Sequence, residues 1–226
     1  MTLQIGFLIF PRFQLIDLAG PFDLFAQVPD SRLHLIWKDL EPLRATAGCD
    51  LKPTTTLDAC PALDLICIPG GTGVNALMQD AEILDFVRAQ AASARFVTSV
   101  CTGALVLGAA GLLRGKRATT HWASHHLLKE LGAIPVEERI VTDGKLITGG
   151  GATAGIDFAL AAIAQLVGRD AAEVAQLELE YAPAPPFDAG SPDSAPAEIL
   201  ALLKEKIAPS KQRRDEANSR AAARLA

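Results

Sequence analysis

Cysteine and histidine are scarce in this sequence, and long apolar runs are absent. Its four cysteines, Cys49, Cys60, Cys67 and Cys101, form no C-x-x-C pair and have no histidine at ligand spacing. This pattern disfavours both a structural zinc site and a disulfide framework. No apolar run approaches the ~18 residues that span a bilayer, and residues 2–10 lack the charged start of a signal peptide. We therefore expect a cytoplasmic protein with reduced thiols, no bound metal and no membrane partner.

Charge is distributed unevenly along the chain. The formal net charge is −5 over 226 residues, yet residues 204–226 hold seven Lys and Arg residues against three Asp and Glu residues. The rest of the chain is therefore acidic, which argues against nucleic acid as a partner. Half of the residues are hydrophobic, enough to bury one sizeable core. We expect one domain over residues 1–196 and a C-terminal helical arm over residues 197–226.

Short β-branched or aromatic runs alternate with helical patterns in the first half of the chain. The strand runs cover residues 3–10, 32–38, 63–69 and 95–100, and the helical patterns include residues 16–27, 80–93 and 102–113. This alternation is typical of an α/β domain with a mostly parallel sheet. Near-continuous apolar runs such as FLIF and LICI suit a sheet that is covered on both faces. The sequence therefore predicts a three-layer α/β/α sandwich.

The second half predicts a hairpin, a core helix, an irregular crossing and the helical arm. Asp143-Gly144 separates two β runs within residues 139–151, which is the pattern of a hairpin with a type I′ turn. Residues 154–168 form an apolar helix of about four turns. The Pro-rich residues 181–196 predict an extended surface crossing. Helices at 197–207 and 211–225 would form an arm that is either disordered or laid on a second subunit.

The segment SVCTG, residues 99–103, places a cysteine where a strand run gives way to a helical one. Small residues surround Cys101, as in the G-x-S-x-G elbow, where a sharp strand-to-helix turn presents the nucleophile. Unpaired N–H groups at the start of a helix would lower the pKa of the thiol. The thiol would then be exposed at the carboxyl edge of the sheet, where α/β proteins carry out chemistry. Cys101 is the predicted nucleophile, and an inert buried cysteine is the alternative.

Histidine does not supply an obvious base for this cysteine. The four histidines are His34, His121, His125 and His126. None follows position 126, so the late histidine and acid of a glutaminase triad are absent. Asp17 is the candidate instead, because it follows the first strand in apolar surroundings; its alternative role is to cap the next helix. Burial and a nearby thiolate would both favour its protonated form, so it can donate a proton and later accept one.

The glycine-rich turn PGGTG, residues 69–73, follows the third strand run. An N–H of this turn, together with that of Thr102, would form a hole for developing negative charge. No G-x-G-x-x-G fingerprint and no following Lys-Ser/Thr pair are present, which disfavours a phosphate-binding loop.

Three motifs in this order resemble those of the ThiJ/PfpI superfamily: IDLAGPFD, IPGGTG and SVCTGALVLGAAGLLRGKRATTHW. The resemblance covers residues 3–190 and is strongest to the isocyanide hydratases, including the late segment LEYAPAPPFDAGSPDSAP. It implies a flavodoxin-like sandwich of the class I glutamine amidotransferase kind with a cysteine elbow. It also implies a homodimer that needs no metal or organic cofactor.

Carried over to these motifs, the resemblance places the nucleophile at Cys101, its acidic partner at Asp17, an assisting hydroxyl at Thr102 and the oxyanion-hole glycine at Gly71. Thr102 stands where the protease-like branch has histidine, which argues against peptidase activity. The implied reaction adds water to a small apolar isocyanide and gives an N-substituted formamide through a cysteine thioimidate. Such a substrate predicts a dry, hydrophobic pocket.

Other functions stay open from the sequence. The Cys101 motif is also similar to the sensor domains of AraC-type regulators, but residues 197–226 are too short for their DNA-binding module. A detached ligand-sensing module is therefore one alternative. A redox-responsive protein, in which Cys101 is oxidised rather than turned over, is a second. A glyoxalase-like enzyme with a polar pocket is a third.

Overall fold

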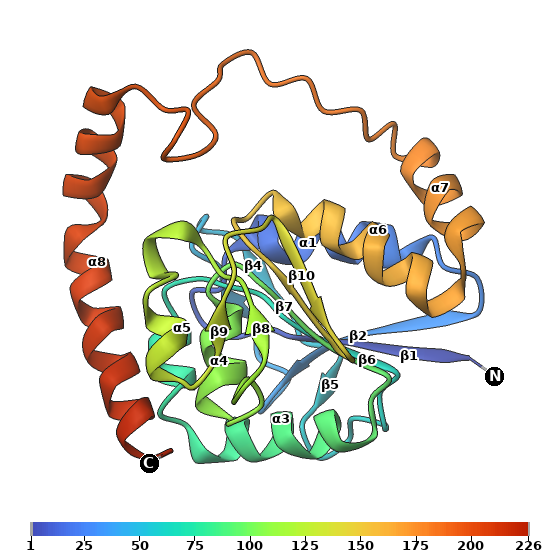
Figure 1. The fold of residues 1–226 in the computed structure, drawn as a ribbon. Helices are drawn as coiled ribbons and strands as arrows, with labels where there is room; N and C mark the ends of the chain where they lie inside the picture. Colours follow the sequence, from blue (N-terminus) through green and yellow to red (C-terminus); the bar gives the residue numbers. More distant parts are fainter. Residues whose placement is uncertain (1, 226) are drawn as a thin grey trace.

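A seven-stranded sheet forms the centre of the computed structural model, which describes residues 2–225 (Figure 1). Its strands are β1 (Leu3–Leu8), β2 (Ser31–Trp37), β5 (Thr55–Thr56), β6 (Leu65–Ile68), β7 (Phe96–Val100), β10 (Ile140–Asp143) and β11 (Leu146–Gly149). They lie in the order β10-β11-β7-β6-β1-β2-β5, and only the edge strand β10 pairs antiparallel in this described sheet. The mostly parallel sheet predicted from the sequence is confirmed.

Helices and two small ribbons surround this sheet. The ribbons pair β3 (Leu43–Arg44) with β4 (Asp50–Leu51) and β8 (Arg117–Ala118) with β9 (Ile134–Pro135). The helices are α1 (Leu15–Ala26), α2 (Val74–Leu77), α3 (Ala81–Ser93), α4 (Gly103–Ala109), the 3₁₀ helix η1 (Trp122–Ser124), α5 (Leu127–Glu130), α6 (Ala154–Val167), α7 (Arg169–Glu178) and α8 (Ala197–Ala223). Among the described residues, no helix has both the length and the apolar character needed to cross a membrane.

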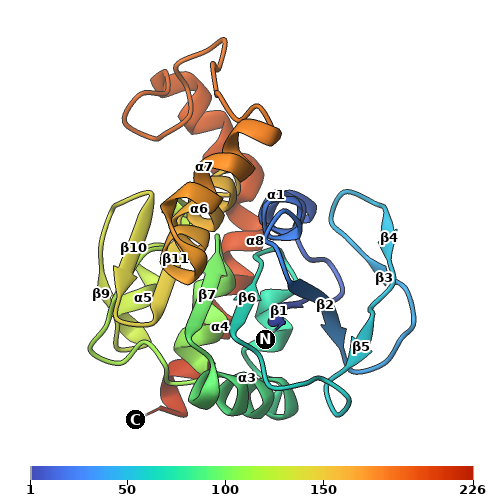
Figure 2. The same ribbon diagram turned by 90° about the vertical axis from the view of Figure 1, so that its right-hand side faces the viewer.

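Helices cover both faces of the sheet. Figure 2 shows α1 and α6 together on one face and α3 and α4 on the other. The residues of β6 are buried throughout, as its unbroken apolar run requires. Phe25 of α1 packs edge-on against Phe158 of α6 and against Phe7 of β1, which joins one helix layer to the sheet. The predicted three-layer sandwich is confirmed.

The predicted hairpin is present, but its turn is not type I′. Asp143 pairs with Leu146, so Gly144 and Lys145 are the two loop residues. Gly144 has a φ of 62° and Lys145 does not share a positive φ, whereas a type I′ turn needs two such residues. Asp143 instead ends β10, and its carboxylate accepts a hydrogen bond of 2.9 Å from the N–H of Arg117. This contact with β8 holds Asp143 in the strand and moves the turn one residue along.

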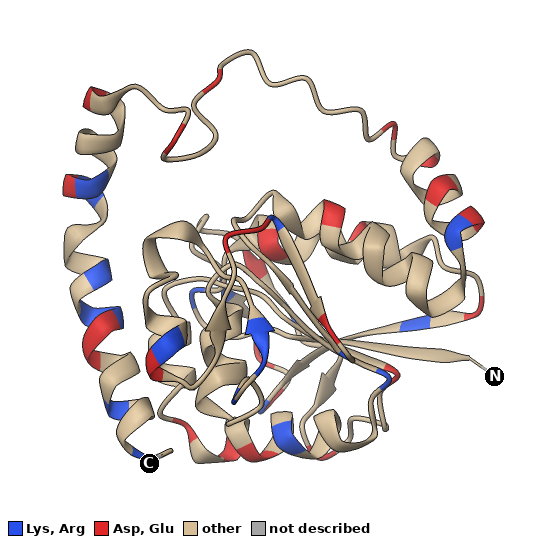
Figure 3. Cartoon of the chain, in the orientation of Figure 1, with Lys and Arg blue, Asp and Glu red and all other residues tan. Residues whose placement is uncertain are grey.

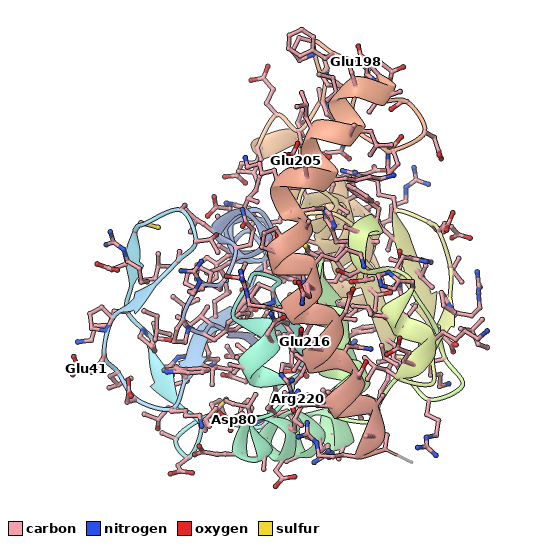
Figure 4. The ribbon with its side chains drawn as sticks, turned by 90° about the vertical axis from the view of Figure 1, so that its left-hand side faces the viewer. Glu41, Asp80, Glu198, Glu205, Glu216 and Arg220 are labelled. Atoms are coloured by element: carbon pink, nitrogen blue, oxygen red, sulfur yellow. The ribbon has the colours of Figure 1, made fainter. Side chains whose placement is uncertain are left out.

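The C-terminal region forms one continuous helix rather than the two predicted. Helix α8 runs through Pro209, where one backbone hydrogen bond is lost. Its last third is anchored on the body, since Ala217, Asn218 and Ala221 are buried against α2, α4 and α5. Figure 4 shows α8 crossing the body, with Glu198 in the part that projects beyond it and Arg220 in the part that lies over it. Packing of this last third therefore outweighs the cost of the proline.

Candidate active site

Cys101 lies in a strained elbow between β7 and α4. Its φ is 55°, a left-handed conformation that costs energy for a residue with a side chain. Two hydrogen bonds hold the elbow: the Cys101 N–H donates to the carbonyl of Gly149 at 3.0 Å, and Thr120 Oγ1 donates to the Cys101 carbonyl at 2.7 Å. The structure thus places Cys101 where the sequence predicts a nucleophile.

Glycines allow this elbow and the neighbouring turn to approach each other closely. A Cβ atom on Gly103 would lie 2.0 Å from the carbonyl oxygen of Ile68. One on Gly70 would lie 2.6 Å from Asp17 Oδ2 and 2.7 Å from the Thr102 nitrogen. Neither position has room for a side chain, so the PGGTG turn and the cysteine elbow are packed against each other at the carboxyl edge of the sheet.

Asp17 of α1 is fully buried beside this elbow. Its Oδ2 accepts a hydrogen bond of 2.9 Å from the Gly70 N–H, and the carboxyl also interacts with the Cys101 thiol. Among the described residues, Oδ1 has no nitrogen or oxygen hydrogen-bond partner. The side chain does not cap α1, whose N-cap residue is Gln14. Asp17 is therefore held as a buried carboxyl against the cysteine, and the capping alternative is wrong.

Cys101 and Asp17 titrate as a coupled pair, and the pKa of the Cys101 thiol is shifted in the direction opposite to the prediction. Burial raises the pKa of Asp17 to about 7, although the Gly70 hydrogen bond opposes the shift. Burial, followed by the charge of Asp17, also raises the pKa of the Cys101 thiol. The predicted lowering of the thiol pKa is wrong, because desolvation outweighs the N–H of Thr102 and α4 has only seven residues. Two negative charges are unfavourable in this buried place, so the pair gives up one of its two protons near pH 7 and keeps the other.

Thr102 and Gly71 meet beside the cysteine. The Gly71 N–H donates to Thr102 Oγ1 at 3.1 Å, and the N–H of Thr102 faces the Cys101 thiol. Gly71 has a φ of 133°, a conformation that favours glycine, and an added Cβ would lie 2.4 Å from the Arg12 carbonyl. The structure therefore brings together all four residues that the sequence singles out at one edge of the sheet.

A cavity of about 280 Å³ opens onto these residues. Its lining consists of Gln14, Gly71, Thr72, Cys101, Thr102, His121, Ala123, Ala152, Ile207, Ser210 and Arg214. The prediction of a dry, hydrophobic pocket is confirmed only in part: most of the exposed lining is apolar, yet six of these side chains carry amide, hydroxyl, imidazole or guanidinium groups. Three of the six, His121, Ser210 and Arg214, come from the start of η1 and from α8, which sequence reasoning did not place at the site.

His121 and Arg214 are two cavity residues with ionisable side chains that the sequence motifs did not assign to the site. Nδ1 of His121 accepts the Ala123 N–H at 3.2 Å, which leaves the proton on Nε2, and burial lowers its pKa. His121 is thus a neutral donor rather than a base. Arg214 lies in an alanine-rich, basic segment with no motif to mark it. Within residues 2–225, no group of three or more His, Cys, Asp and Glu side chains could hold a metal ion.

An α/β sandwich in which a cysteine elbow faces a buried carboxyl is the arrangement implied by the ThiJ/PfpI resemblance. The model of the DJ-1/PfpI family matches residues 4–165, and the chain belongs to this family. A crystal structure of a ThiJ/PfpI family protein from Pseudomonas syringae has a TM-score of 0.93 and 42% identity, covering 96% of this chain and 91% of that chain.

Two curated relatives bear on activity. The isonitrile hydratase of Pseudomonas putida is 62% identical over 225 residues, which cover 100% of this chain and 99% of the hydratase. The HTH-type transcriptional regulator GbdR of Pseudomonas aeruginosa is 31% identical over 175 residues, 74% of this chain but only 47% of the regulator. The likeness to the hydratase extends beyond the family match, through α7 and α8.

Proposed function

We infer that this protein hydrates organic isocyanides, also called isonitriles, to N-substituted formamides. The observation that carries this inference is the 62% identity to the Pseudomonas putida isonitrile hydratase over the whole chain. The buried pair of a cysteine nucleophile and a carboxyl supplies the groups that the reaction needs. The likeness to a transcriptional regulator covers less than half of that regulator, which favours the enzyme over a sensor module.

The first chemical step uses the proton that Cys101 and Asp17 share. The Cys101 sulfur attacks the terminal carbon of R–N≡C, and the shared proton moves to the same carbon through Asp17. The product is a thioimidate, R–N=CH–S, on Cys101, and Asp17 is left as a carboxylate. Burial of Asp17 favours this transfer, because a raised carboxyl pKa makes it a competent acid near neutral pH.

The second step adds water to this thioimidate. The Asp17 carboxylate removes a proton from water, the hydroxide attacks the thioimidate carbon, and the proton passes to the substrate nitrogen. The N–H of Thr102, which faces the Cys101 thiol, stabilises the tetrahedral species, R–NH–CH(OH)–S, while the Gly71 N–H holds Thr102 Oγ1 beside it. Collapse of this species releases R–NH–CHO and returns the hydroxyl proton to the Cys101–Asp17 pair, so one water is consumed in each cycle.

A comparison of two substrates tests this function. The purified protein should convert cyclohexyl isocyanide to N-cyclohexylformamide, measured by mass spectrometry, and should leave methylglyoxal unchanged at the same enzyme concentration. Turnover of methylglyoxal without turnover of the isocyanide would replace the hydratase with the glyoxalase-like alternative. If neither substrate reacts while Cys101 is oxidised rapidly by peroxide, the redox-responsive alternative is favoured.

The rate should depend on pH through the Cys101–Asp17 pair. Below about pH 7 both members are protonated, so no anion is present to begin the reaction; above it the pair carries one charge and one proton. We therefore expect kcat/KM to rise with pH through about 7 and then level off. A series from pH 5 to 9 at constant ionic strength measures this. A flat profile, or an unchanged rise in Asp17→Asn, would contradict the assignment.

Thr102 assists the reaction without being essential to it. Thr102→Val removes the hydroxyl that accepts the Gly71 N–H, and a buried donor without a partner costs about 1–3 kcal/mol. We expect kcat to fall by about tenfold to a hundredfold, while Thr102→Ser, which keeps the hydroxyl, retains most of the activity. Steady-state kinetics on both variants checks this. Equal losses in the two variants would remove the hydroxyl from the mechanism.

We propose that the active form is a homodimer. Apolar side chains are strongly exposed on α7 and on the outer part of the chain that follows, including Leu177 at 81%, Phe187 at 79% and Leu202 at 63%. Figure 1 shows this part arching away from the sheet before α8 returns to it. Side chains of this kind gain stability when a second copy covers them. Wild-type protein should sediment as a dimer and Leu177→Asp/Leu202→Asp as a monomer; a monomeric wild type would overturn the proposal.

We also place the enzyme in the cytoplasm. All four cysteines are free thiols in the structure. Free thiols that include a nucleophile suit a reducing compartment. Fractionation of cells that express the tagged protein tests this, and recovery outside the cytoplasm would contradict it.

A further inference from the structure

Helix α8 lies beyond the segment matched by the family, yet it is fixed firmly to the body of the protein. Gln79 Nε2 donates to the Ala217 carbonyl at 2.8 Å, and Asn218 Nδ2 donates to the Leu127 carbonyl at 3.3 Å. Figure 4 shows Glu216 and Arg220 in the part of α8 that crosses the body. These contacts place the preceding turns of the helix in a defined position over the carboxyl edge of the sheet.

The preceding turns form one wall of the active-site cavity. Ile207, Ser210 and Arg214 follow each other at helical spacing, so they share one face of α8, and all three line the cavity. Cys101 and His121 line the same cavity from the body. In this chain the active-site cavity is therefore completed by a helix that lies outside residues 4–165, the segment that the family model matches.

Arg214 brings a positive charge to this wall without an acidic partner of its own. Its Nη1 donates to Ser124 Oγ at 2.9 Å, a neutral acceptor. Its Nε is buried and has no hydrogen-bond partner among the described residues. The adjacent acid, Asp215, pairs with Lys211 at 2.7 Å and with His126 at 3.4 Å instead. Within the cavity lining, the side chain that can carry a negative charge is Cys101.

A partly buried guanidinium whose Nε is buried and unpaired is unfavourable without an anionic partner, which suggests that its charge serves the site. The titratable groups that face Arg214 are Cys101 with its partner Asp17, His121 before η1, and Asp215 on α8. Of these, His121 is neutral because burial and the Arg214 charge lower its pKa. The charge of Arg214 opposes the upward shift of the Cys101 pKa.

We propose that Arg214 is a positioning residue of the active site, whose guanidinium stabilises the negative charge of the Cys101–Asp17 pair across the cavity. The pair must carry one charge before the sulfur can attack, and again when the tetrahedral species collapses. A fixed cation on α8 lowers the energy of both states without touching the proton that the pair exchanges. The consequence for hydration rests on the proposed function, whereas the effect on the thiol does not.

Alkylation of Cys101 tests this without any isocyanide. The variants are Arg214→Gln, which keeps a hydrogen-bond donor for Ser124 but removes the charge, and Arg214→Lys, which keeps the charge. Arg213→Gln is the matched control, since it makes the same change in net charge at an exposed neighbour on α8. Figure 3 shows both basic and acidic residues along this helix, and a nonspecific effect of net charge would appear in the control as well. Iodoacetamide is the probe, because it is neutral and is not attracted by the guanidinium.

We expect alkylation of the Cys101 peptide at pH 8 to slow by about tenfold in Arg214→Gln, with its pH profile displaced upward, because the loss of one nearby charge is worth about one pKa unit. Arg214→Lys should recover much of the rate, and Arg213→Gln should match the wild type. Wild-type alkylation in a folded Arg214→Gln would overturn the proposal, and so would equal losses in the Gln and Lys variants. If the variants show this alkylation pattern but the wild type does not turn over an isocyanide, the proposed function fails and the assignment of Arg214 stands.

Discussion

Replacement of Cys101 by alanine should lower kcat/KM for isocyanide hydration by about 10⁴-fold or more, to the limit of detection. The sulfur forms the covalent bond to the substrate carbon, and no other side chain in the cavity lining is a comparable nucleophile. The change removes one buried atom from the strained elbow, so the fold and the Asp17 hydrogen bond to Gly70 should be retained. Formamide production, followed by mass spectrometry, is the measurement.

A second cysteine provides the control for this experiment. Cys60 is partly buried near Pro61 and Gln90, and it does not line the cavity. Cys60→Ser should therefore keep wild-type activity, which separates loss of the nucleophile from loss of a thiol. Hydration by Cys101→Ala at more than a few per cent of the wild-type rate would show that water is activated without covalent catalysis, and the mechanism would have to be abandoned.

Asp17→Asn should change activity and stability in opposite directions. Loss of the only acid in the pair should lower kcat/KM by about 10²- to 10⁴-fold, the usual contribution of a positioned proton donor. The folded protein, however, should become more stable at pH 8, because an ionised carboxylate in a buried place is unfavourable and asparagine does not ionise. The amide oxygen can still accept the Gly70 N–H, so the fold retains that contact.

The sign and size of the stability change follow from the pKa of Asp17. It is raised from 3.8 to about 7 in the folded protein, so the folded state binds the proton more tightly than the unfolded chain does. Wild-type stability therefore falls as pH rises from about 4 to 7, by up to about 4 kcal/mol. Asp17→Asn should melt higher than the wild type by about 10 °C at pH 8 and by little at pH 4. A lower melting temperature at pH 8 would show that Asp17 is not a strained, buried carboxylate.

The sequence predicted the parts of the fold that depend on local pattern. Strand runs with unbroken apolar residues, such as LICI in β6, indicate a parallel sheet covered on both faces because few other environments tolerate them. The small residues around Cys101 indicate the elbow because a sharp turn excludes bulk. The position of Asp17 near this elbow could be predicted only on the condition that the first strand is central; the structure meets this condition, because β1 lies next to β6 and β6 next to β7.

Features that depend on tertiary contacts could not be predicted in the same way. The thiol pKa is decided by burial, which exceeds the contribution of a short helix. The positive charge in the cavity wall comes from Arg214 of α8, which the Pro-rich residues 181–196 carry far from the sheet before it returns. Nothing local in that crossing indicates where the helix will lie. Arg214 therefore acquires a role only when Asn218 and Ala217 anchor α8 on the body.

Covalent capture of the substrate on Cys101 tests the central claim most directly. Wild-type protein mixed with cyclohexyl isocyanide and quenched in acid after milliseconds should gain the mass of one intact isocyanide molecule, located on the Cys101 peptide. The adduct should decay at the rate at which N-cyclohexylformamide appears, and it should be absent from Cys101→Ala. Formamide released at the full rate with no adduct on Cys101 would contradict the account.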